Sequence, residues 1–256
     1  MVGSSPPPVV VDVATVTGRP VEDGALIERA ALGHHTGSPW LEQSVLELDA
    51  GRTAIRDTGE CEEVLFVLGG HGRLRAAGTT HDLAPESGAY LPPAHVYELS
   101  AAGDEELLLV SVRVPDPVGD SAPGKVVVRR LEDQSAAQAT TDREFRVIAD
   151  PATGLKSATH FVGYIPTKRA PDHFHTYDEV IYVLDGHGRF HAVDQSWQLG
   201  PGSCIALPSR TVHCLENLGG DVMRVVAVFR PAGSPAAAYY PDGAPAYPGL
   251  APVAPG

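Results

Sequence analysis

Short apolar runs, separated by Gly, Pro or charged residues, recur along most of this chain. Runs rich in β-branched residues and bounded by turn formers predict β-strands, whereas the 3.6-residue periodicity of long helices is scarce. The expected strands are SVLELDAG, EEVLFVLGG, GRLRAA, GAYLPP and ELLLVSVRV, and then KVVVRR, FRVIAD, SATHFVGYI, EVIYVLDG, GRFHAV, SCIALP and MRVVAVFR.

The second group of strands repeats the first. Residues 62–99 align without gaps to residues 178–215, at a constant offset of 116 (178 − 62), which pairs Glu63 with Glu179 and Pro92 with Pro208. Two copies of one antiparallel β unit, built from short strands at this spacing, favour sandwiches or barrels over alternating strands and helices.

The repeat divides the chain into five segments. We expect an N-terminal arm and lead-in over 1–39, a first barrel over 40–115, a linker or exchanged strand over 116–130, a second barrel over 131–230, and a Pro/Ala/Tyr-rich arm over 231–256. Within the lead-in, Val10–Val16 could form an edge strand and Gly24–Ala31 is expected to contain a short helical turn.

The stretch PDHFHTYDEVIYVLDGHG of the second copy carries the candidate chemistry. Residues two apart on a strand point to the same side, so His173, His175 and Glu179 can converge on one point. Imidazole and carboxylate groups are metal ligands. A pair of histidines two residues apart is, however, equally compatible with the solvent-exposed start of a strand that binds no metal. His213, which follows a turn at Pro208, adds a fourth potential ligand, and the four together favour a metal site.

The spacings HxHx3Ex6G and Gx5PxRx2Hx3N resemble the two signature motifs of the cupin superfamily. The resemblance implies an all-β fold of two tandem antiparallel β-barrels, each a double-stranded β-helix. It also implies that His173, His175, Glu179 and His213 hold one divalent metal ion (Fe, Mn, Ni, Cu or Zn). The sequence departs from the motifs at Thr167 and Arg210, where the family has Gly, and neither position is a ligand.

The first copy lacks these ligands. At the offset of 116, Asp57, Gly59 and Tyr97 stand where the second copy has His173, His175 and His213, and only Glu63 is kept. We therefore expect a metal-free first barrel that serves packing, dimerisation or as a lid. The pair resembles a bicupin over residues 40–230.

Three neutral imidazoles and one carboxylate would give a divalent ion a net charge of about +1. Such a site suits a small, anionic, oxygen-rich chelating substrate. We expect a metal-dependent oxygenase (dioxygenase), because few proton-transfer groups accompany the motif. The alternatives are a non-redox isomerase, cyclase, decarboxylase or hydrolase, and a binding protein without catalysis. Candidate substrate-pocket residues are Phe161, Tyr164, Tyr182, Phe190, Arg210 and Phe229.

Charge and cysteine content indicate which classes of binding partner and which compartment to expect. The formal net charge of −13 argues against nucleic acid or an anionic membrane as partner. Three cysteines without CxxC spacing indicate a reducing compartment, and we see neither a signal peptide nor an apolar run long enough to span a membrane. We expect a cytoplasmic protein with a small-molecule substrate, and by resemblance a homodimer.

Overall fold

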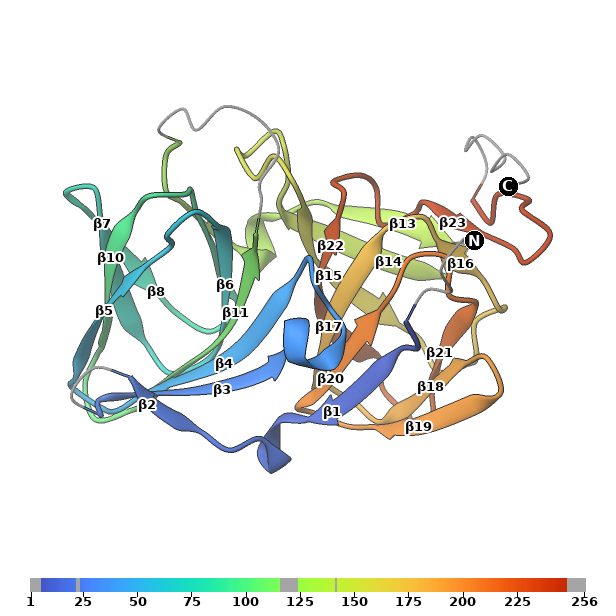
Figure 1. The fold of residues 1–256 in the computed structure, drawn as a ribbon, viewed down its shortest axis with the longest axis horizontal. Helices are drawn as coiled ribbons and strands as arrows, with labels where there is room; N and C mark the ends of the chain where they lie inside the picture. Colours follow the sequence, from blue (N-terminus) through green and yellow to red (C-terminus); the bar gives the residue numbers. More distant parts are fainter. Residues whose placement is uncertain (1–5, 22–23, 116–123, 141, 248–256) are drawn as a thin grey trace.

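The computed structural model describes residues 6–21, 24–115, 124–140 and 142–247. These residues form two β-barrels that lie side by side (Figure 1), with three short 3-10 helices at Val13–Thr15, His34–Thr36 and Leu131–Asp133. Every strand pairing is antiparallel, as predicted. No described helix is long and apolar enough to cross a membrane.

The first barrel closes a seven-stranded sheet against a four-stranded one. The larger sheet has the order β12 (Val127–Arg130), β9 (Ser87–Leu91), β6 (Glu62–Gly69), β11 (Leu107–Val114), β4 (Glu42–Leu48), β3 (Leu26–Leu32), β2 (Arg19–Val21). The smaller sheet has the order β5 (Thr53–Asp57), β10 (Val96–Ala101), β7 (Gly72–Ala76), β8 (Thr79–Leu83).

The second barrel also has a seven-stranded sheet, which faces a three-stranded sheet and a small two-stranded one. Its larger sheet has the order β1 (Val9–Asp12), β20 (Ser203–Leu207), β17 (Asp178–Asp185), β22 (Met223–Arg230), β15 (Thr159–Ile165), β14 (Arg143–Ala149), β13 (Ala136–Thr140). The smaller sheets are β19 (Gln195–Leu199), β18 (Gly188–Ala192), β21 (His213–Asn217), and β16 (Phe174–His175) with β23 (Ala238–Tyr239).

The barrels exchange their outer strands. β1 pairs with β20 of the second barrel, and β12, which follows the first barrel in sequence, pairs with β9 of that first barrel. Figure 1 shows β1, in blue, lying against the second barrel. Residues 116–123 of the expected linker lie outside the described residues.

The expected lead-in, 1–39, differs from the structure in two ways. β2 and β3 extend the first barrel's sheet, so this barrel begins before residue 40. The helical turn expected in Gly24–Ala31 is wrong, because Leu26–Leu32 pairs along its length with β4 and buries both of its terminal leucines. Sheet pairing outweighs the local helix preference of Glu and Ala here.

Three apolar clusters explain why so many strands read as unbroken apolar runs. One fills the first barrel, one fills the second, and the third lies between the two large sheets. On β22, Val225 and Ala227 face the interior of the second barrel, whereas Val226 and Val228 face the first barrel. Strands buried on both faces need apolar residues at every position.

The turn shared by the two copies depends on glycine. Gly70 and Gly186 both have positive φ, 75° and 86°. A Cβ at Gly186 would lie 2.8 Å from the Cα of Met223, and one at Gly70 would lie 1.9 Å from the backbone oxygen of Glu106. Only glycine combines this conformation with so close an approach.

Candidate metal centre

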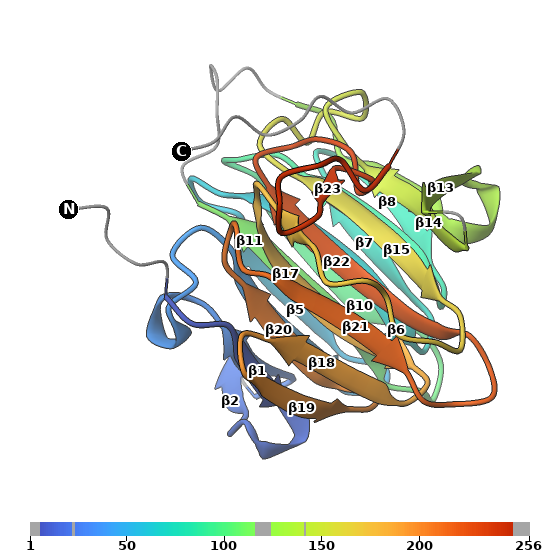
Figure 2. The same ribbon diagram turned by 90° about the vertical axis from the view of Figure 1, so that its right-hand side faces the viewer.

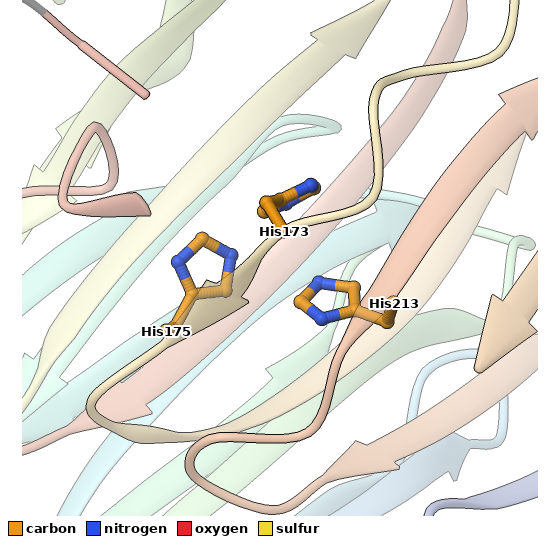
Figure 3. A group of neighbouring side chains, drawn as sticks. All are labelled: His173, His175 and His213. Atoms are coloured by element: carbon orange, nitrogen blue, oxygen red, sulfur yellow. The ribbon is translucent and has the colours of Figure 1, made fainter. Parts of the chain in front are cut away.

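Three histidines from two separate parts of the chain meet in the second barrel. His173 directly precedes β16, His175 ends it and His213 begins β21, and one ligand atom from each lies within 4.8 Å of the others. Figure 3 shows the three rings converging on one space. The backbones of His173 and His213 exchange two hydrogen bonds, of 3.0 and 2.8 Å, which fix the two strands relative to each other.

Each imidazole is oriented by a backbone carbonyl. The Nδ1 atoms of His173, His175 and His213 lie 2.8, 3.1 and 2.9 Å from the carbonyl oxygens of Pro171, Ala237 and Thr211. A carbonyl can only accept, so each Nδ1 carries the proton and each Nε2 keeps a free lone pair. This arrangement is typical of metal-ligating histidines.

Burial keeps the three rings neutral. It lowers the pKa of His175 to about 3 and the pKa of His213 well below its ordinary value, with further lowering by neighbouring histidines. Burial also lowers the pKa of His173. Three neutral imidazoles with free Nε2 atoms could hold a metal ion, so the residues present fit the predicted group.

Glu179, on β17, is buried and borders the same cavity as the histidines. Burial raises the pKa of its carboxyl to about 8. A nearby cation would compensate the cost of ionising this carboxyl in the barrel interior. The group of ligand atoms that lie within 4.8 Å of one another contains the three histidines and not this carboxyl, so its expected role as a fourth ligand stays a prediction.

Tyr177 belongs to this site and was not among the predicted residues. Its ring stacks on His175 at 4.6 Å and on Phe229 at 3.9 Å between centroids. Tyr177 continues the two-residue spacing of His173, His175 and Glu179, and this spacing was the available signal in the sequence.

The histidines border a cavity of about 480 Å³ in the second barrel, a size typical of small-molecule sites. Apolar side chains and charged side chains both contribute to its walls. Among them are Phe145, Phe161, Ile181, Leu215, Val225, Tyr164, Tyr240, Arg143, Glu144, Lys168 and Arg169.

Only two of the six candidate pocket residues, Phe161 and Tyr164, line this cavity. Tyr182 has the opposite strand parity to Glu179, so it faces the cluster between the barrels. Arg210 is exposed, and its contribution is a backbone N–H that donates to the His175 carbonyl at 2.7 Å.

Phe190 and Phe229 point into the barrel but lie behind other residues. Phe229 is covered by Tyr177, which stacks on it. Phe190 lies between Trp197 and His213, with centroids at 5.5 and 6.0 Å. Both therefore support the site rather than line the cavity.

The C-terminal arm closes one side of the site. β23 pairs with β16, the Ala237 carbonyl orients His175, and Tyr239 stacks on Phe174 with centroids 5.7 Å apart. Figure 2 shows this segment, in dark red, lying across one end of the second barrel. The arm is thus packed through Tyr239; residues 248–256 lie outside the described residues.

The register of the first barrel corrects the alignment of its site. His173 lies opposite His213, whereas Tyr97, the equivalent of His213, lies opposite Arg56 rather than Asp57. Asp57 pairs instead with Val96. Between Arg56 and Gly59 the first barrel therefore has one residue more than the second barrel has between the equivalent positions. Arg56 is therefore the counterpart of His173.

Arg56 places a positive charge where the second barrel gathers its histidines. Its Nη2 lies 3.5 Å from Oε1 of the buried Glu63, and its Nε donates to the Tyr97 hydroxyl at 2.9 Å. Ser111 also donates to Glu63, at 2.6 Å. A guanidinium thus compensates the carboxylate that the first barrel shares with the second.

The remaining histidines of the second copy lie apart from the cluster. His160 is buried between the barrels, with its ring 6.2 Å from Phe66 and its Nδ1 without a hydrogen-bond partner among the described residues. His191 pairs with Glu216 at 2.8 Å, and His187 is exposed.

Comparison with known proteins agrees with this description. Residues 160–229 match the cupin domain family. No curated protein matches the chain in sequence. Protein Ylba from E. coli has a similar structure, with a TM-score of 0.74, 11% identity, and coverage of 87% of this chain and 90% of that one.

Two further structures share the fold. The putative glyoxylate-induced protein from Pseudomonas aeruginosa has a TM-score of 0.73, 17% identity, and coverage of 86% and 88%. Oxalate decarboxylase from Lactobacillus farciminis, in a formate complex, has a TM-score of 0.71 and 13% identity, and the match covers 87% of this chain and 86% of that one. Residues 160–229 of the second barrel are therefore similar to the cupin domain family, and the chain as a whole has an all-β fold of two cupin-like barrels.

Proposed function

We propose that this chain is a bicupin metalloenzyme that acts on a small, anionic, oxygen-rich molecule in the cavity of the second barrel. His173, His175 and His213, with Glu179, would hold one divalent ion. The observation that carries the proposal is the shared orientation of the three imidazoles, each with Nδ1 on a backbone carbonyl and Nε2 free. When bound, a divalent ion can polarise a substrate oxygen or lower the pKa of a bound water.

The cavity also bears on the reaction class. The expectation of an oxygenase depended on a scarcity of proton-transfer groups, but Tyr164, Lys168 and Glu144 line this cavity. These groups can hold or move a proton in the cavity, which supports non-redox chemistry such as an isomerisation, decarboxylation or hydrolysis. We therefore favour a non-redox metalloenzyme, with an oxygenase as the second candidate.

A substrate screen in air and under argon tests the proposal. The protein is loaded separately with Fe(II), Mn(II), Ni(II), Cu(II) and Zn(II) and incubated with small oxo, hydroxy and amino acids, and substrate loss is followed by mass spectrometry. Metal-dependent turnover that is absent in His213→Ala supports the enzyme, and equal rates under argon support the non-redox class. Binding without turnover would identify a binding protein, and absence of metal binding would overturn the proposal.

A further inference from the structure

Arg143, the first residue of β14, is a cation of the cavity that does not belong to the histidine cluster. Its side chain lines the cavity that the histidines border, as does that of the preceding residue, Asp142. We propose that Arg143 binds the carboxylate of the substrate, so that the cavity selects small carboxylic acids with an apolar side chain. This inference rests on the proposed function of the same site.

Arg143 is held in place but keeps most of its hydrogen-bonding capacity. Its Nη2 donates to the backbone oxygen of Leu215 at 2.9 Å, two residues beyond His213 on β21. A guanidinium has five N–H donors, and among the described residues this is the one hydrogen bond that the Arg143 side chain donates. The bond ties the guanidinium to the strand that carries His213.

The neighbouring cations of the cavity already have carboxylate partners. Lys168 pairs with Asp142, and Arg169 pairs with Asp172 at 3.1 Å while also donating to Sγ of Cys214 at 3.2 Å. Arg143 takes part in none of the ion pairs formed among the described residues. It is thus the cavity cation best placed to receive an external anion.

Arg143 is close to the histidine cluster. Its charge adds to the lowering of the pKa of His173 and His213, for which burial is the main cause. Burial also lowers the pKa of Arg143 itself, although Asp142 partly opposes this. Arg143 is half-buried, so part of the hydration of its charge is lost, and an incoming carboxylate would compensate that cost.

The apolar part of the cavity wall indicates what kind of side chain the substrate carries besides its carboxylate. Phe145, Phe161 and Leu215 belong to the apolar cluster of the second barrel and also line the cavity. A carboxylate can accept two parallel N–H bonds from a guanidinium, which orients it more strictly than one bond does. A small acid held in this way would direct its remaining oxygens toward the histidines and its side chain toward the apolar wall.

Cobalt-loaded protein provides a test that does not require the natural substrate. Co(II) bound at the histidine cluster has a visible absorption spectrum, and we would titrate it with acetate, glycolate and 3-phenyllactate and with the corresponding amides. The variants are Arg143→Gln, Arg143→Lys and, as a matched control, the exposed Arg189→Gln on β18.

We expect at least one acid to bind about 10- to 100-fold more tightly than its amide in the wild type and in Arg189→Gln, since a bond between charged partners is worth this much. In Arg143→Gln the preference should fall by about tenfold while one cobalt per chain is retained. Arg143→Lys should keep part of the preference, and it replaces the Gln variant if that variant loses cobalt or fails to fold.

A preference that survives unchanged in Arg143→Gln would overturn the inference, because the metal alone would then account for it. Equal binding of acids and amides by the wild type would do the same. Loss of cobalt from the wild type would instead contradict the proposed metal site, so the two failures are distinguishable.

Discussion

Arg56 lies opposite Tyr97 across β5 and β10, in the register in which His173 lies opposite His213 in the second barrel. The two barrels therefore compensate an equivalent buried carboxylate in different ways. In the first barrel a guanidinium lies beside Glu63, whereas in the second the facing residues leave three imidazoles around an open cavity beside Glu179.

Arg56→Ala should destabilise the protein by about 3–5 kcal/mol, because it leaves the buried Glu63 without its cation. Urea denaturation of the wild type and the variant at pH 7 measures this difference. Arg73→Ala, which removes an exposed partner of Asp82, is the control and should cost at most about 1 kcal/mol. An equally small cost for Arg56→Ala would mean that the buried pair does not stabilise the first barrel.

Metal content should depend on His213 and not on its counterpart Tyr97. Elemental analysis of the purified proteins should give one divalent ion per chain for the wild type and for Tyr97→Phe, and none for His175→Ala or His213→Ala. The exposed His187→Ala is a matched control and should keep its metal. Metal retained by both histidine variants would refute the site, and metal lost from Tyr97→Phe would show that the first barrel also binds an ion.

Removal of the C-terminal strand should weaken metal binding without unfolding the barrel. A chain ending at Gly233 lacks the Ala237 carbonyl that orients His175, and loss of such an outer partner typically lowers metal affinity about 10- to 100-fold. Competition with a chromophoric chelator measures the affinity, and circular dichroism monitors the fold. Deletion of residues 248–256 alone keeps that carbonyl and is the control; equal affinity in both truncated chains would show that the strand does not position His175.

His160 should make the metal-free protein more sensitive to acid. Burial lowers its pKa from 6.5 to about 3, so unfolding takes up a proton between these pH values and the folded state loses stability as the pH falls through this window. As the pH falls, the free energy of unfolding of the wild type should decrease by up to about 1.4 kcal/mol per pH unit more than that of His160→Leu. Urea denaturation at pH 7, 6 and 5 checks this, and parallel profiles of the two proteins would count against it.

Much of this organisation could be predicted from the sequence because it depends on local patterns. The alternation along β17 places Glu179 on the inner face, and the paired Gly70 and Gly186 mark equivalent turns. The same alternation puts Tyr182 on the outer face and thereby excludes it from the pocket.

Other features depend on contacts between distant segments. One extra residue between Arg56 and Gly59 shifts the first barrel's register, and an alignment at constant offset does not reveal it. The segment with β23 has no strand pattern of its own and becomes a strand only against β16. Arg143 is 30 residues before His173 (173 − 143), and only the barrel's closure brings both to one cavity.

The exchange of β1 and β12 has a consequence for dividing the chain. A cut at about residue 125 would leave the second half without β1, exposing the edge of β20, and would leave the first half without β12, exposing the edge of β9. Open edges recruit other strands, so each fragment alone would tend to aggregate. Mixed together, the two fragments carry each other's missing strands, and this fold is therefore suited to fragment complementation.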